Sequence, residues 1–169
     1  MNTFGLSIAV RAAREWATND QVSFSRFFDL SLNDQKWLVA ASEELVSDLC
    51  QMATSPFQIS FEILQGGLDA VSKTIPSASV GLVTTILTSI ADDLKKDLRI
   101  AMINWGITSY DKAMWLAESS IQERLRLAMK GSISFSLRCE TKHLSAGVQN
   151  PTAKMAALLR VISSPRKAS

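Results

Sequence analysis

Apolar residues recur at intervals of three and four along most of the chain, and this spacing is typical of amphipathic helices. The clearest stripes predict helices over residues 4–17, 31–54, 57–71, 80–106 and 109–130. A short helical segment near residues 22–28 and a last helix that begins at Asn150-Pro151 complete the pattern. We therefore expect an all-α fold of seven to eight helices.

Two helix starts carry recognisable capping signals. Ser31 and Asp34 stand three positions apart, as in a capping box whose side chains bond the free amides of a first helical turn. Ser55-Pro56 resembles a second start, because proline in the first helical position loses no hydrogen bond. These signals support helices that begin near residues 31 and 56.

Residues 132–140 follow a different pattern. Ile133, Phe135, Leu137 and Cys139 alternate with polar residues, and a period of two is typical of a strand. No other segment offers a convincing partner strand, and a lone strand leaves its backbone groups unpaired. The segment is either a strand that pairs with its own copy in an oligomer or a helix imposed by tertiary context, and we favour the helix slightly.

Charge is divided unevenly along the chain. The net charge is +2, but residues 1–97 carry −5 and residues 98–169 carry +7. The turn near Pro76 suggests two helical halves, residues 1–76 and the basic half 77–169. Such asymmetry predicts an anionic partner for the basic half, or an acidic surface on a neighbouring subunit.

No residue pattern indicates catalysis or metal binding. His143 is the only histidine, and no cysteine or carboxylate stands near it at ligand or catalytic spacing. The adjacent Asp92-Asp93 would face different sides of a helix, and Gly66-Gly67 lacks the lysine of a phosphate-binding loop. We therefore expect a protein that is not an enzyme and that needs neither a metal nor another cofactor.

The cysteines and the longest uncharged run bear on location. A disulfide between Cys50 and Cys139 is one alternative, but so sparse a pair is more typical of reduced, packed thiols in an intracellular protein, which we expect. The uncharged run over residues 74–91 contains a proline and several hydroxyl side chains, whereas a spanning helix needs about 20 predominantly apolar residues. We expect a cytoplasmic protein without a membrane span.

The basic region that begins at Arg124 holds nine basic residues and one acid, Glu140. A solvated surface, a nucleic-acid site and a site for a protein or membrane partner are three interpretations. Hydroxyl side chains between Ser132 and Ser145 suit phosphate oxygens, and Trp115 lies near the cationic stripe, so RNA is the favoured partner. The candidate contact residues are Arg124, Arg126, Lys130, Arg138, Lys142, Lys154 and Arg160.

The predicted helix over residues 109–130 has apolar side chains beside its polar stripe as well as on its core face. Trp115, Leu116 and Leu127 lie there, and a helix that is apolar on its outer side usually contacts another surface. Together with the charge division, this patch predicts a homo-oligomer. Head-to-tail contact between unlike surfaces closes into a ring when the rotation permits.

Two family resemblances bear on function. Asn104-Trp105-Gly106 resembles the core of the first homology motif of the Bcl-2 family, although Ile107 replaces the arginine of that motif. This resemblance implies an all-α protein-interaction module, without nucleic-acid binding, whose groove takes an amphipathic helix.

The stretch from Trp105 to Ser120, together with the small size and basic C-terminal half, resembles closterovirus RNA-silencing suppressors of the 20-kDa class. That resemblance implies a viral, ring-forming helical protein in the host cytoplasm that sequesters RNA, with double-stranded RNA the expected form. Our leading hypothesis is thus a non-enzymatic, sequence-tolerant RNA-binding protein, and the interaction module is the alternative.

Overall fold

The structure, a computed structural model, describes residues 3–63, 77–130 and 132–149 of the chain. Within these ranges it contains nine helices and one sheet of three short strands, which confirms the predicted all-α class. The helices are α1 (Thr3–Asn19), α2 (Gln21–Phe27), α3 (Leu32–Ala40), α4 (Glu43–Cys50), α5 (Ala78–Lys96), α6 (Leu98–Trp105), α7 (Tyr110–Glu118), α8 (Ile121–Lys130) and α9 (Thr141–Gln149).

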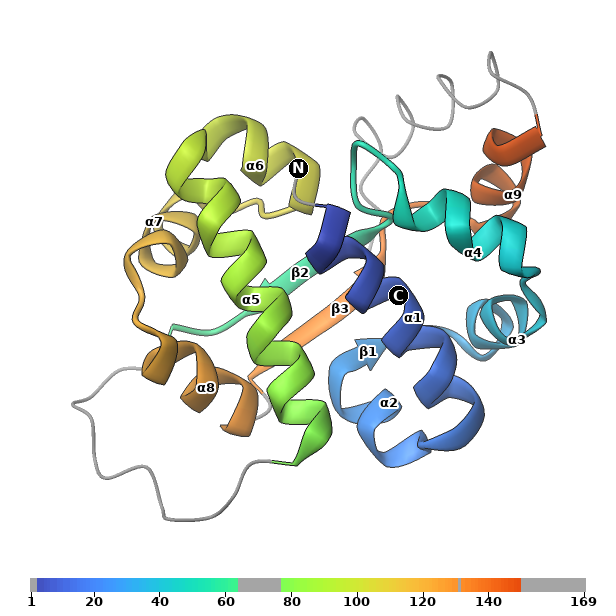
Figure 1. Cartoon of the computed structure of the whole chain (residues 1–169), viewed down its shortest axis with the longest axis horizontal. Helices are drawn as coiled ribbons and strands as arrows, with labels where there is room; N and C mark the ends of the chain where they lie inside the picture. Colours follow the sequence, from blue (N-terminus) through green and yellow to red (C-terminus); the bar gives the residue numbers. More distant parts are fainter. Residues whose placement is uncertain (1–2, 64–76, 131, 150–169) are drawn as a thin grey trace.

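The sheet brings together three segments that are distant in the sequence. Its order is β1 (Phe28–Asp29), β3 (Ile133–Leu137) and β2 (Phe57–Phe61), with β3 in the middle. β3 runs parallel to β1 and antiparallel to β2. Figure 1 shows β3 and β2 crossing the centre of the molecule beneath α5 and α1.

The predicted helix over residues 57–71 is wrong where the structure describes it, because residues 57–61 form β2. Phe57, Ile59 and Phe61 are buried, whereas Gln58 and Ser60 are more exposed. A spacing of four fits both a helix and a strand, so Phe57 and Phe61 alone did not separate them. Residues 64–71 lie outside the described part of the chain.

The slight preference for a helix over residues 132–140 is also wrong where β3 forms, at Ile133–Leu137. Ile133, Phe135 and Leu137 are buried on one face, as the alternation indicated. The partner that the sequence did not reveal is β2, with Phe61 opposite Ile133 and Ser60 opposite Ser134. Because β2 had been assigned to a helix, β3 appeared to lack a neighbour.

Three long helices of the sequence interpretation are each divided into two. α3 and α4 separate at Ala41-Ser42, and α5 and α6 separate at Asp97. The side chain of Ser42 accepts from the Leu45 amide, and that of Asp97 accepts from the Ile100 amide. Each break is therefore the N-cap of the following helix, because an oxygen side chain satisfies a free amide of its first turn.

The third break separates α7 from α8 at Ser119-Ser120. Ser120 and Glu123 form a capping box: the Glu123 amide donates to the Ser120 hydroxyl, and the Ser120 amide donates to the Glu123 carboxylate. The bond from the Ser120 amide is the largest cause that lowers the pKa of the Glu123 carboxyl, and a second bond to the carboxylate from the Ser120 hydroxyl lowers it further. The predicted cap at Ser31 is confirmed, since its hydroxyl accepts from the Asp34 amide.

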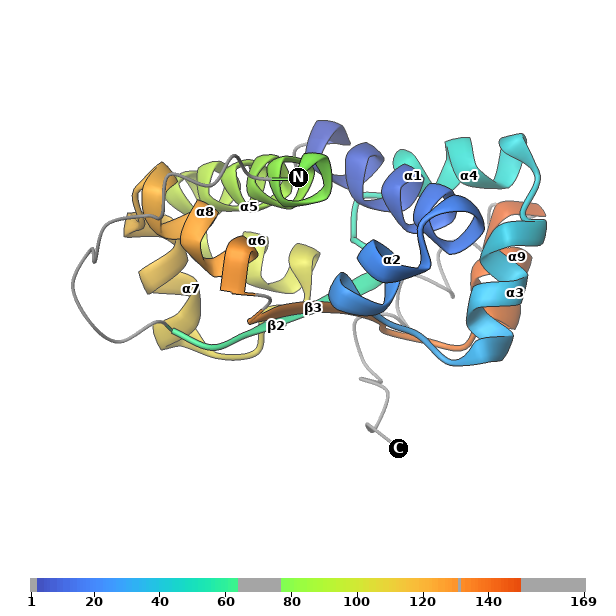
Figure 2. The ribbon, with the colours of Figure 1, turned by 90° about the horizontal axis from the view of Figure 1, so that it is seen from below.

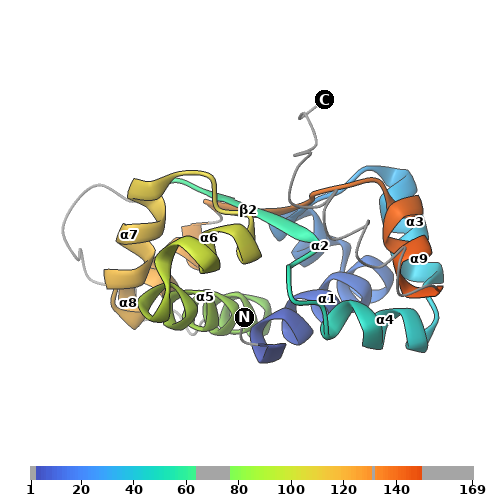
Figure 3. The same cartoon turned by 90° about the horizontal axis from the view of Figure 1, so that it is seen from above.

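The helices α1 and α5 lie side by side over the same face of the sheet (Figures 2 and 3). They approach closely at Gly5, where an added Cβ would lie 2.4 Å from the Ser89 Cβ. Beneath them the rings of Phe28, Phe57 and Phe135 pack together, with centroids of Phe28 and Phe135 5.3 Å apart. The core therefore joins a helix layer to the apolar face of the sheet.

Strands and helices from both sides of residue 76 share this core, since α1 packs on α5 and β2 pairs with β3. The division into two halves at residue 76 remains a prediction. Cys50 and Cys139 are both buried, and neither forms a disulfide, as expected. Among the described residues, no helix is both long and apolar enough to cross a membrane.

Phe135 is fully buried in the central strand, so we expect Phe135→Ala to lower the free energy of unfolding by about 3–5 kcal/mol. Ser134→Ala is the matched control, because Ser134 lies on the other face of β3 and is half-buried. That control should change stability by no more than about 0.5 kcal/mol. Urea denaturation followed by tryptophan fluorescence measures both, and equal losses would contradict the assigned faces of β3.

Candidate functional site

The predicted RNA contacts fall into separate environments. Arg126 and Lys130 lie four positions apart on α8, and Lys130 is exposed whereas Arg126 is half-buried. One helical turn separates them, about 5.4 Å along the helix axis. These two residues remain on the surface, as expected.

A third cation joins them from a distant part of the chain. Arg26, in the last turn of α2, donates through Nη2 to the carbonyl oxygens of Ala128 and Met129 at the end of α8. This bond satisfies helix-end carbonyls that lack partners within the helix, and a cation is favourable at that end. Arg26 is exposed, and we call Arg26, Arg126 and Lys130 the basic corner.

Arg124 lies on the inner side of α8 instead, with only 6% of its surface exposed. Its Nη1 donates to the carbonyl of Ser119 at 2.5 Å and to the hydroxyl of the same residue at 3.3 Å. Burial lowers the pKa of this guanidinium, and the negative charges of Asp92 and Glu123 oppose that shift. Arg124 therefore secures the α7–α8 break, and a phosphate would not reach it in this arrangement.

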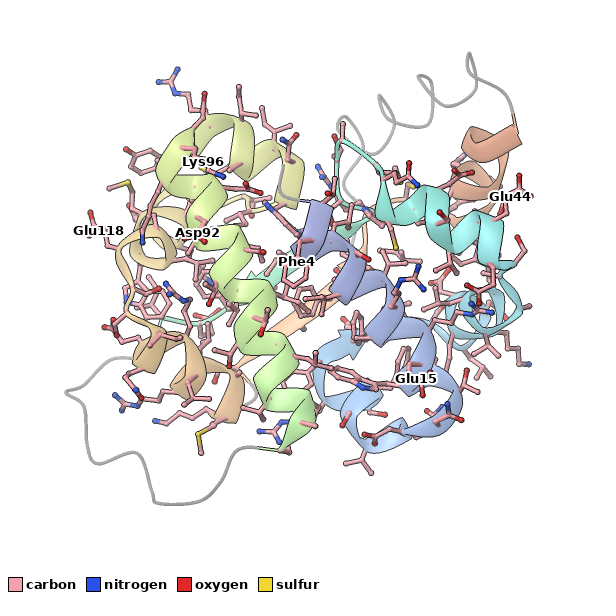
Figure 4. The ribbon with its side chains drawn as sticks, in the orientation of Figure 1. Phe4, Glu15, Glu44, Asp92, Lys96 and Glu118 are labelled. Carbon is pink, nitrogen blue, oxygen red and sulfur yellow. The ribbon has the colours of Figure 1, made fainter. Side chains whose placement is uncertain are left out.

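Asp92 lies on α5 beside Lys96, and Glu118 ends α7 nearby, whereas Glu15 and Glu44 lie on α1 and α4 toward the other side of the molecule (Figure 4). Glu15 and Glu44 are thus distant from α7 and α8, whereas Glu62 forms an ion pair with Lys112 of α7. Part of the acidic charge of the N-terminal half is therefore also separated in space from the basic helix α8.

Arg138 is the second buried cation among the predicted contacts, with 7% of its surface exposed. It follows β3 directly, and its Nη1 donates to the carbonyl of Ile103 at 2.9 Å and weakly to that of Ser55 at 3.5 Å. Burial lowers the pKa of this guanidinium, and interaction with Cys139 opposes the shift. Arg138 thereby links β3 to the end of α6.

Gly106 makes room for this arginine. It closes α6 in the left-handed conformation with φ of 67°, and a Cβ there would lie 3.2 Å from both Cδ and Nε of Arg138. The same Cβ would lie 3.0 Å from the Gln58 backbone. The preceding Trp105 is buried, and its indole donates to the Asp93 carboxylate at 3.0 Å. The Asn104-Trp105-Gly106 motif therefore has a structural role in this fold.

Arg138 also lines a recess of about 440 Å³ at the end of α6, which we call the Arg138 recess. Its walls are mainly apolar and are contributed by α6, the α6–α7 turn, the first residue of α7 and Arg138. The lining includes Met102, Ile103, Ile107, Tyr110 and a second arginine, Arg99. An apolar recess with a few polar groups is the usual form of a ligand site.

The other predicted contacts contribute less to either site. Lys142 is exposed and forms an ion pair with Glu140, which reduces the charge that it offers to a partner. Lys154 and Arg160 lie outside the described residues. Arg26 and Arg99 were not selected from the sequence, because Arg26 belongs to the acidic half and Arg99 precedes the basic run.

The apolar patch expected on the outer side of residues 109–130 is wrong. Leu116 and Leu127 are fully buried in the core of the same chain, and Trp115 packs against Phe61 with ring centroids 5.9 Å apart. The break at Ser119-Ser120 changes the direction of the helix, so a stripe drawn along one continuous helix does not persist into α8. The predicted self-association loses this support and remains a prediction.

Comparisons with protein-family models, with curated proteins and with solved structures found no match to this chain. Among the described residues, no group of three or more histidine, cysteine or acidic side chains is placed to hold a metal ion.

Gly106→Ala should destabilise the protein by at least about 1–2 kcal/mol, because a left-handed backbone strains an L-residue and the added Cβ meets Gln58 and Arg138. Gly81→Ala is the matched control: Gly81 lies in α5, and its added Cβ meets nothing within 4 Å. That change should stabilise the protein by about 0.5–1 kcal/mol. Thermal unfolding of both variants measures the difference, and a tolerated Gly106→Ala would refute the close packing of Arg138.

Proposed function

We propose that the protein is a non-enzymatic, sequence-tolerant RNA-binding protein that uses the basic corner as part of its binding surface. The observation that carries the proposal is the position of Arg26, which α2 holds against the end of α8. It brings a cation from the acidic half of the sequence to the last turn of α8, the helix that Lys130 ends. The basic region is thereby extended by a residue about a hundred positions away.

The form of this surface suits phosphate contacts. Arg126 and Lys130 project from one helix a turn apart, and Arg26 adds a planar guanidinium from a second helix. Arginine and lysine bind phosphate oxygens without reading base edges, so such contacts carry no sequence information. Affinity for a surface of this kind comes mainly from counterion release and decreases steeply with salt.

The proposed surface differs from the one expected from the sequence. Arg124 and Arg138 are omitted because their guanidinium groups bond backbone carbonyls inside the fold. Lys142 is secondary because of its ion pair, while Lys154 and Arg160 stay in the proposal as residues outside the described ranges. The family resemblance implies that the protein sequesters double-stranded RNA and thereby acts as a viral suppressor of RNA silencing. We include this role in the same proposal.

Arg126→Ala combined with Lys130→Ala should weaken binding to duplex RNA by about tenfold, equally for unrelated sequences. The log–log salt dependence of the affinity should decrease by about one to two units, because two phosphate contacts are lost. Fluorescence anisotropy at two salt concentrations measures both quantities. Arg26→Ala is kept apart from this pair, because its loss also removes the cap of α8.

The control is Arg11→Ala with Lys36→Ala, which removes the same charge from exposed positions on α1 and α3. RNA binding that falls equally in both double variants would reflect net charge alone and would contradict a defined site. Parent-like RNA affinity in the Arg126 and Lys130 variant, with its fold intact by circular dichroism, would show that the basic corner is only solvated surface.

A further inference from the structure

The Arg138 recess combines apolar walls with positive charge. Arg99 and Arg138 both line it, and none of the described residues in its lining carries a carboxylate. Met102, Ile103 and Ile107 also line it, together with the ring of Tyr110. The recess therefore offers two cations next to aliphatic side chains and lacks a negative group of its own.

Arg138 forms no salt bridge with a carboxylate among the described residues. Its hydrogen bonds run from Nη1 to two backbone carbonyls, and no bond from Nε or Nη2 to a described residue is formed. A buried cation without a counter-ion is costly, since its lost hydration is repaid only by close opposite charge. An anion that entered the recess would supply that charge.

Arg99 marks the outer side of the same recess. It is exposed on α6 and forms no ion pair with the described residues. One turn further along α6, Ile103 is 50% exposed, and Tyr110 at the start of α7 is 58% exposed. Ile100 adds a further exposed aliphatic side chain beside Arg99. Apolar surface thus extends from the recess onto the rim of α6.

We propose that the Arg138 recess binds a short peptide segment of a partner protein in which an acidic side chain is flanked by aliphatic residues. The carboxylate lies between Arg99 and Arg138, and the aliphatic residues contact Ile103, Tyr110 and the rim. A peptide is favoured over a free aliphatic acid because the apolar surface continues outside the recess along α6. A ligand confined to the recess would leave Ile100, which does not line it, uncovered.

This site is separate from the basic corner, because it is built from α6, the α6–α7 turn and the residue after β3 rather than from α2 and α8. The inference therefore does not depend on RNA binding. Either site could fail its test without affecting the other.

The probe is a fluorescein-labelled peptide with one central aspartate between leucines and a glycine-serine tail for solubility. The matched peptide carries asparagine in place of the aspartate, and hexanoate serves as the free aliphatic acid. Anisotropy measures affinity, and methyl NMR of isoleucine-labelled protein locates the site. We expect saturable binding of the aspartate peptide, with shifts at Ile103 and Ile107, and about tenfold weaker binding of the asparagine peptide.

Arg99→Ala should weaken the aspartate peptide about fivefold and the asparagine peptide hardly at all, since it removes a charge. Ile103→Ser should weaken both peptides, because it removes apolar contact area. Arg11→Ala and the Arg126 and Lys130 double variant should bind the aspartate peptide like the parent. Arg99 and Ile103 are exposed, so these variants should fold normally.

Three outcomes would overturn the proposal. Equal affinity for the aspartate and asparagine peptides would show that the recess does not recognise the carboxylate. Hexanoate that binds more tightly than the peptide and shifts the same methyl groups would identify a free aliphatic acid as the ligand. Absence of saturable binding up to the solubility limit, or methyl shifts only outside the recess, would refute the peptide site altogether.

Discussion

The pairing of β3 with β1 and β2 is the interaction on which the rest of the structure depends. β3 lies between a strand near residue 28 and a strand near residue 59, so three distant segments meet at one place. Its buried side chains, Phe135 above all, fill the space beneath α1 and α5. The sheet is small, but its backbone hydrogen bonds and aromatic packing hold the N-terminal helices to those that follow residue 77.

Both candidate sites derive from that arrangement. Arg138 comes directly after β3, and its amide donates to the Pro56 carbonyl beside β2, so the strand pairing fixes where its guanidinium lies relative to Gly106 and α6. α8 leads into β3 from the other end, and α2 leads into β1, which brings Arg26 to the last turn of α8. The basic corner and the Arg138 recess are therefore produced at opposite ends of one central strand.

The sequence predicted the fold class and the elements whose signals are local. The Ser31 cap is confirmed, and Arg126 and Lys130 both reach the surface of α8, because capping and helical periodicity act within a few residues. β2 could not be recognised alone, since Phe57 and Phe61 suit a helix equally well and its strand state depends on a partner 76 residues away. The burial of Arg124 and Leu127 was missed because of the break at Ser120, whose capping signal with Glu123 is present in the sequence.

The central claim is that β3 holds the fold together, and hydrogen–deuterium exchange followed by mass spectrometry tests it most directly. If the claim is correct, peptides that cover residues 132–138 and 57–62 exchange together and as slowly as those from the middle of α5. Their opening free energy should then equal the free energy of global unfolding, because the strands separate only when the core does. Fast exchange in both strand peptides, while α1 and α5 remain protected, would contradict this account.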